Sequence, residues 1–411
     1  MNRRSLAPPP ARLLVVAATL VVGGLFSKAA EACPFCSSVQ QTFAEEIASM
    51  DVVAFASLIQ PGGEPPAGSD ELPKSRFRAG ELIKGDAWLR VNNEIDVHYF
   101  GKPDLSVKYL VMGTDPPSVI WSTPLAMTER SYKYVKEITQ LPDDQSRLKF
   151  FLKYLEDEDE MLARDSYDEF ARAPYADVIG LKPLMDRERL MGWIENKDVP
   201  VSRRRLYLTM LGICGTAEDA QALRKYMESD DRQQKAGLDA MIACYLKLVG
   251  PQGMELVEKL FLGNPEAEYA DTYAAIMAVR FHGNESDDIP RDRLLQGLRL
   301  VLDRPQLADL VIPDLARWED WSVIPKLVEL FKNADDDSNW VRVPVVNYMK
   351  ACPLPEATAQ IDKLKEIDPE SVKRASVFFP YAQSAQKPRT TDKADGSNDN
   401  NDEPAPQKPA E

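Results

Sequence analysis

The chain has 411 residues, enough for two or three domains, and its 65 acidic side chains outnumber its 50 basic ones, giving a formal net charge of −15 at pH 7. This balance disfavours a nucleic-acid partner, because phosphate contacts need clustered Lys and Arg. The only two histidines, His98 and His282, lie far apart in the sequence, so a histidine-based zinc site or a Ser-His-Asp triad has almost no residues to draw on.

Residues 1–32 are predicted to be a signal peptide. Three arginines among the first twelve residues form a positive region, and the apolar run 13–26 has the length of a signal core. An Ala-Glu-Ala cleavage site ends directly before Cys33. The apolar run is short for a membrane-spanning helix, which favours cleavage over a retained anchor. We therefore expect an exported protein, periplasmic or extracellular, with no stable membrane span after cleavage.

Cleavage would leave Cys33 as the first residue, three positions before Cys36. A Cys-x-x-Cys pair is a redox motif when a strand delivers it to a helix N-terminus, where the helix dipole lowers the thiol pKa. Only the signal peptide precedes this pair, although a helix through Val39, Phe43 and Ile47 is predicted after it. A local disulfide in an oxidising compartment is the favoured interpretation, and a redox catalyst is the alternative.

Short strands are predicted next, because stretches rich in β-branched and aromatic residues, one of them alternating with polar residues over 94–100, lie between Pro- and Gly-rich turns. Strands so closely spaced suggest a small closed barrel or a sandwich, followed by a helix over 128–138. The expected strands cover 51–59, 77–84, 94–100, 108–112 and 118–121.

An N-terminal cysteine pair, an Asp-Val-Val strand and a strand ending Ile83-Lys84-Gly85 together resemble the OB-type barrel of the netrin-like modules. A Lys-Tyr-Leu-Val-Met-Gly strand from Lys108 and a closing helix extend this resemblance over 33–140. The tissue inhibitors of metalloproteinases belong to that group, and the resemblance implies that a free N-terminal cysteine could chelate a protease zinc. Family members tie this cysteine to later barrel cysteines, but here none occurs between Cys36 and Cys214.

A helical pattern with short Pro or Gly breaks covers 145–376. Its clearest part is the stretch 216–283, where two helical hairpins follow one another and neither could bury its apolar face alone. The spacing of roughly 30 to 40 residues resembles HEAT-like repeats, with tetratricopeptide repeats as the second choice. The chain as a whole resembles exported bacterial HEAT-like repeat proteins, which implies no catalytic residues. The second helices of the hairpins are expected near Met161, Ser202, Arg232, Tyr269, Leu307 and Asn339.

Helical spacing indicates which residues of this stretch face the core. The predicted apolar face of one second helix includes Leu238, Met241, Ile242 and Tyr245, with Asp230-Asp231 as its N-cap. In the next second helix the predicted face comprises Tyr269, Tyr273, Ile276 and Val279.

Several clusters permit a functional reading, but a structural one is favoured for each. The carboxylates 156–160 are expected in a solvated turn, with weak calcium binding as the alternative. The arginines 203–205 are expected on an exposed helix face, although they could grip an anion. Cys214, Cys244 and Cys352 are interpreted as buried thiols.

Trp318-Glu319-Asp320-Trp321 is predicted to lie at a hairpin turn. Tryptophans in such turns usually pack between repeats, and the alternative is an aromatic patch that anchors a partner. Trp318, Asp320 and Trp321 are therefore the candidate protein-binding residues.

The fold class predicted from the sequence is a multidomain α and β chain: a small OB-like β-barrel, then an α-solenoid of HEAT-like hairpins, then a disordered tail over 382–411. The expected function is a non-enzymatic scaffold that binds another exported protein, with no catalytic residue, metal or cofactor. One alternative is a protease-inhibitor-like or metal-directed module that uses Cys33. Another is a thiol–disulfide enzyme that uses Cys33 and Cys36.

Overall fold

A computed structural model of the chain describes residues 35–36, 39–63, 72–142 and 144–377. The expected signal peptide and the expected tail lie outside these residues. The chain divides into two compact units, Met1–Val311 and Ile312–Glu411, and each is described by itself.

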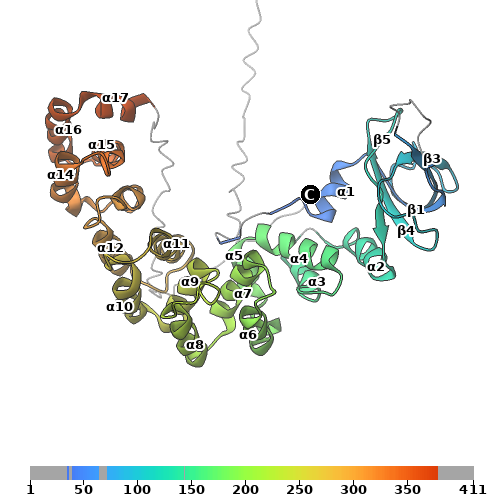
Figure 1. Ribbon diagram of the computed structural model, residues 1–411, viewed down its shortest axis with the longest axis horizontal. Coiled ribbons are helices and arrows are strands. Elements are labelled where there is room, and N and C mark those ends of the chain that lie inside the picture. Colours follow the sequence, from blue (N-terminus) through green and yellow to red (C-terminus); the bar gives the residue numbers. More distant parts are fainter. Residues whose placement is uncertain (1–34, 37–38, 64–71, 143, 378–411) are drawn as a thin grey trace, which may run out of the picture. The chain divides into compact units, whose positions relative to one another are not determined.

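The first unit begins with a near-closed antiparallel sheet of six strands in the order β3-β2-β1-β4-β5, with β6 also paired to β4. Central strand β1 pairs with β2 through Leu58 and Phe77, and with β4 through Ala54 and Val111. The sheet confirms the predicted barrel-like fold ahead of the helices (Figure 1). The strands are β1 (Val52–Gln60), β2 (Lys74–Lys84), β3 (Glu94–His98), β4 (Lys108–Thr114), β5 (Ile120–Trp121) and β6 (Leu125–Met127).

Residues on both faces of β1 are buried, which explains why this strand is apolar almost throughout rather than alternating. One face points into the barrel core, where Phe77 and Tyr109 meet edge-on with ring centroids 5.2 Å apart. On the other face, Phe55 packs 4.5 Å from the ring of Tyr132, which belongs to α2 (Glu129–Ile138). Gly85 follows β2 with φ of +87°, and a Cβ there would lie 2.6 Å from the carbonyl oxygen of Asp51, so only glycine fits.

Two helices flank the barrel in sequence, α1 (Phe43–Ser49) and α2, and both begin with a capping box. The hydroxyl of Thr42 accepts from the backbone N–H of Glu45, whose carboxylate accepts from the backbone N–H of Thr42. Thr128 and Ser131 do the same for α2. These pairs satisfy N–H groups that a helix start leaves unbonded.

Helices make up the rest of the described chain (Figure 1). In the first unit α6 packs on α7, α8 on α9, and the second helices α7, α9 and α11 pack side by side, which makes a solenoid-like helical array. Its helices are α3 (Leu148–Phe151), α4 (Glu160–Arg172), α5 (Tyr175–Gly180), α6 (Arg187–Glu195), α7 (Val201–Cys214), α8 (Ala217–Met227), α9 (Leu238–Val249), α10 (Met254–Val257), α11 (Tyr269–Glu285) and α12 (Arg291–Val301). The second unit contains α13 (Ile312–Arg317), α14 (Ile324–Asn333), α15 (Arg342–Ala351), α16 (Pro355–Ile367) and α17 (Pro369–Val377).

Helix α9 is largely buried, and its predicted apolar face is confirmed. Leu238, Met241 and Ile242 are all buried, because α7, α8 and α11 cover the helix. The predicted N-cap is wrong: α9 begins after Gly237, which has φ of +77°, while Asp231 caps the preceding turn by accepting from Gln233 N–H.

The arginines 203–205 are not an exposed face, which corrects the expectation from the sequence. Arg203 and Arg204 are buried. The guanidinium of Arg204 donates to the carbonyl oxygens of Gln233 and Gln234 at 2.9 and 3.0 Å, which ties α7 to the turn before α9. Backbone carbonyls and carboxylates take up most N–H groups of these buried arginines, although Nε of Arg204 has no hydrogen-bond partner among the described residues.

The carboxylates 156–160 are likewise structural rather than simply solvated. Glu156 accepts from the hydroxyl of Tyr207 at 2.7 Å and pairs with Arg203 at 3.5 Å. Asp157 pairs with Arg130 of α2, and Asp159 caps α4. The run therefore links the closing helix of the barrel to α4 and α7.

Candidate functional site

The segment before the barrel lies against the helical array. We call its described residues, Phe35, Cys36 and 39–49, the strap. Residues 39–42 have no regular secondary structure, and α1 completes the strap before β1 begins. The strap contacts α4, about 125 residues later in the sequence, and also α11, so tertiary contacts hold it in place.

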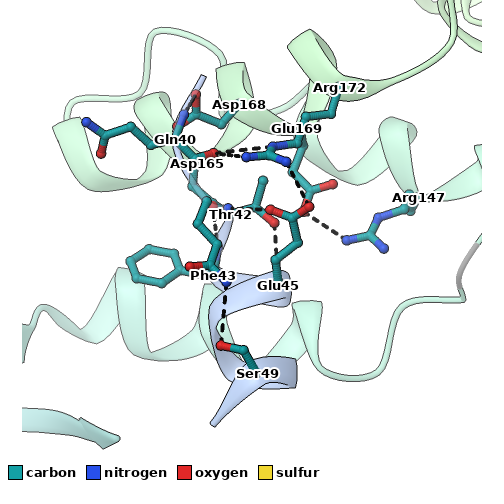
Figure 2. A network of polar contacts seen from close by, with 11 residues as sticks. Gln40, Thr42, Phe43, Glu45, Ser49, Arg147, Asp165, Asp168, Glu169 and Arg172 are labelled. Atoms are coloured by element: carbon teal, nitrogen blue, oxygen red, sulfur yellow. Dashed lines mark hydrogen bonds and ion pairs between the residues drawn. The ribbon is translucent and has the colours of Figure 1, made fainter. Parts of the chain in front are cut away.

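Buried carboxylates of α4 bind the backbone of the strap (Figure 2). The backbone N–H of Gln40 donates to Asp168 at 3.1 Å, and that of Phe43 donates to Asp165 at 2.7 Å. The guanidinium of Arg172 donates to the carbonyl oxygen of Gln40 at 2.8 Å. Positions 165, 168 and 172 share one helix face, so α4 presents acceptors and a donor together. We call these three side chains the clasp.

Asp165 also joins the barrel to the clasp. Its second oxygen accepts a 2.6 Å hydrogen bond from the hydroxyl of Tyr134 in α2. Burial raises the pKa of Asp165 to about 6, although the hydrogen bonds from Tyr134 and Phe43 favour its charged form. One carboxylate thus connects α2, the strap and α4.

A cleft of about 560 Å³ opens beside the clasp, within the size range of small-ligand pockets. Two ion pairs line it: Arg172 with Glu45 at 3.0 Å, and Arg147 with Glu169 at 2.9 Å. Burial raises the pKa of Glu169. The other lining residues are Thr42, Ala44, Ala48, Asp144, Leu148, Ala173, Pro174 and Asp177.

An aromatic socket in the helical array holds the first described residue of the strap. Phe35 is buried, with its ring 5.1 Å from that of Phe281 in α11, which in turn lies 5.0 Å from the ring of Tyr175 in α5. Gly212 and Ala243 also line the socket, and their small size makes room for the phenyl ring. About 10 Å³ of free space remains beside it, so the socket is nearly filled.

His282 is fully buried next to the socket residue Phe281. Its Nε2 lies 2.9 Å from the carbonyl oxygen of Ala243, while Nδ1 has no hydrogen-bond partner among the described residues. Burial lowers the pKa of His282 to about 4, so the ring is neutral at pH 7 and Nε2 carries the donated proton.

Two buried groups should make stability depend on pH in opposite directions. His282 binds its proton more weakly in the folded state, so its contribution to the unfolding free energy is lost as the pH falls from 6.5 to 4. Asp165 binds its proton more strongly in the folded state, so its contribution is lost as the pH rises from 4 to 6. Relative to His282→Gln, the wild type should lose up to about 3 kcal/mol between pH 6.5 and 4.

Relative to Asp165→Asn, the wild type should instead become more stable as the pH falls from 6 to 4, by up to about 3 kcal/mol. Urea unfolding of the three proteins across this range measures both differences. If the unfolding free energies of a variant and the wild type change with pH in parallel, the replaced residue does not have the shifted pKa assigned to it.

The structure places the candidate cysteines only in part. Cys36 is disulfide-bonded and half-buried, whereas Cys33 lies outside the described residues. Cys214, Cys244 and Cys352 are free thiols, and burial raises the pKa of Cys244 well above its usual value, which makes it a weak nucleophile. The inhibitor and redox alternatives built on Cys33 stay predictions.

The candidate binding residues of the second unit are mostly enclosed. Trp318 is 8% exposed, and buried Asp320 accepts from the hydroxyl of Ser322 at 2.6 Å. Trp321 is half-buried, with its ring 5.2 Å from that of Tyr348, whose hydroxyl donates to the carbonyl oxygen of Asp320. A role of these residues in partner binding stays a prediction.

An aromatic pair on α11 is exposed, which corrects its predicted place in the core. Tyr269 is 58% exposed and Tyr273 is 39% exposed, while Ile276 and Val279 of the same predicted face are buried. The two tyrosine rings lie parallel, within 4°, with centroids 6.1 Å apart. Their spacing of four residues suits a core stripe and an exposed stripe equally, so the sequence alone could not distinguish the two.

The described residues of the first unit characterise the protein by its fold alone: a barrel-like sheet and a helical array, with the strap bound against the array. Within this part of the chain, no group of three or more His, Cys, Asp or Glu is arranged to hold a metal ion. None of the described helices combines the length and apolar character needed to cross a bilayer. Comparisons of the chain with protein-family models, curated proteins and solved structures found no match in any of the three.

Proposed function

We propose that the protein is an exported, non-enzymatic scaffold that binds another exported protein through its helical array. Export rests on the signal-like residues 1–32, and we propose that the barrel is OB-type and the array HEAT-like. The observation that carries the binding function is the exposed Tyr269–Tyr273 pair on α11. Exposed tyrosines on a rigid element are typical anchors of protein interfaces, because they bury much area while losing little conformational entropy.

The surroundings of this pair support its use as a preformed contact. Asp271 lies between the two tyrosines in the sequence but is buried, and it pairs with Arg232 at 2.6 Å and with Lys235 at 3.3 Å. These ion pairs fix the first turn of α11 against the turn before α9. A partner would therefore meet tyrosines whose backbone is already ordered, which lowers the entropic cost of association.

Replacing both tyrosines tests the proposal. Tyr269→Ala with Tyr273→Ala should weaken partner capture from the exported fraction by roughly 30-fold, corresponding to about 2 kcal/mol for a binding hot spot. The melting temperature should barely change, because both side chains face solvent. Quantitative pull-down and thermal unfolding measure the two effects.

The matched control is Ile179→Ala with Leu184→Ala, which removes two other exposed side chains, 40% and 52% exposed, from the first unit. This control should capture partners as the wild type does. Undiminished capture by the tyrosine variant would place the binding surface elsewhere.

A further inference from the structure

We propose that the clasp and the aromatic socket form a groove for a peptide segment that carries an aromatic side chain and runs into a helix. The strap of the chain itself occupies the groove, and a partner segment of the same chemistry binds by replacing it. This extends the proposed scaffold function to a second site and can fail independently of the tyrosine pair.

The clasp recognises backbone rather than side chains. Asp168 and Asp165 accept from the N–H groups of Gln40 and Phe43, and Arg172 donates to the carbonyl oxygen of Gln40. Phe43 is the first residue of α1, where N–H groups have no partner within the helix, so any segment that runs into a helix offers the same backbone groups, whatever its sequence. The clasp therefore suits a peptide in general and not only this strap.

The socket supplies the selectivity. It encloses Phe35 between aromatic rings and small residues, with Phe281 at 5.1 Å and Gly212 and Ala243 on its wall. A single aromatic anchor in a fitted pocket is the usual source of peptide specificity. The clasp binds the N–H groups of residues 40 and 43, and the socket holds residue 35. A ligand therefore needs one aromatic residue that lies five positions before the first bound N–H and eight positions before the second.

Release of the strap without a substitute would cost free energy. We therefore expect an incoming segment to replace the strap rather than to bind an empty groove. Asp165 and Asp168 are buried with the strap in place, and without it each would lose a backbone donor. An incoming segment that supplies N–H groups avoids this loss. The cleft of about 560 Å³ beside the clasp is lined by Thr42 and Glu45 of the strap itself, and it gives such a segment room to enter next to the strap.

The test uses a labelled peptide with the sequence of residues 35–49, with Ser at the position of Cys36, and fluorescence anisotropy with the full chain. The attached strap competes in the wild type, so the peptide should bind the Phe35→Ala protein at least about tenfold more tightly. A peptide with Pro at the position of Gln40 lacks the N–H that Asp168 accepts, and it should bind at least about tenfold more weakly than the parent.

Equal binding of the parent peptide to wild-type and Phe35→Ala proteins would overturn the proposal, as would equal binding of the parent and Pro peptides. If Phe35→Ala fails to fold, Phe35→Leu replaces it, because leucine keeps an apolar residue in the socket. The parent peptide should then bind Phe35→Leu more tightly than wild type, by a smaller factor. Equal affinity for Phe35→Leu and wild type would also overturn the proposal. A peptide that binds neither protein, while the wild type still captures partners, removes the groove and leaves the Tyr269–Tyr273 proposal standing.

Discussion

Leu238→Asp is expected to lower the free energy of unfolding by at least about 4 kcal/mol. Leu238 is buried in the first turn of α9, the helix that α7, α8 and α11 cover. A carboxylate there would lose its hydration, and the nearby Arg205 already pairs with Asp239 at 2.8 Å. Urea unfolding followed by helical circular dichroism measures the loss.

The control for this prediction is Leu184→Asp, the same replacement at a leucine that is 52% exposed. It should change the unfolding free energy by no more than about 0.5 kcal/mol, since surface replacements away from special features are nearly neutral. Similar losses in both variants would show that α9 is not the buried centre of the array.

Tyr134→Ala is the second large effect we expect, a loss of at least about 3 kcal/mol. Tyr134 is fully buried where the barrel helix α2 meets α3 and α4, with its ring 5.2 Å from that of Phe150 and 4.8 Å from that of Tyr154. Its truncation leaves a cavity and removes the hydroxyl that Asp165 binds. The same urea unfolding measures it.

Tyr134→Phe separates the two parts of this effect. It keeps the ring and removes only the hydrogen bond to Asp165, so it should cost about 1 to 2 kcal/mol. If Tyr134→Phe and Tyr134→Ala are equally destabilising, the packing of the ring contributes nothing and the hydrogen bond carries the whole effect.

The elements of the fold could largely be predicted because their signals are local. Alternation predicted a strand over 94–100, and β3 is Glu94–His98. Helical spacing placed a second helix near Tyr269, where α11 begins. The three-residue β6 was missed, because so short a strand has no period of its own.

The strap site could not be predicted because its parts are far apart in the sequence. Asp165 and Asp168 have the spacing of any polar helix face, and nothing local shows that Phe43 and Gln40 cover them. Phe35 finds its socket 246 positions away at Phe281. The hydrogen bond from Tyr134 to Asp165 likewise joins the predicted barrel region 33–140 to the predicted helical region 145–376, and only the folded chain reveals it.

Site-specific photo-crosslinking tests most directly whether the helical array is a surface for another protein. The photoreactive residue p-benzoylphenylalanine would replace Tyr273 in one protein and Leu184 in another, and both would be irradiated in cells that export the protein. If α11 anchors a partner, position 273 should give discrete adducts with another protein and position 184 should give none. No adduct from position 273, or the same adducts from both positions, would contradict it.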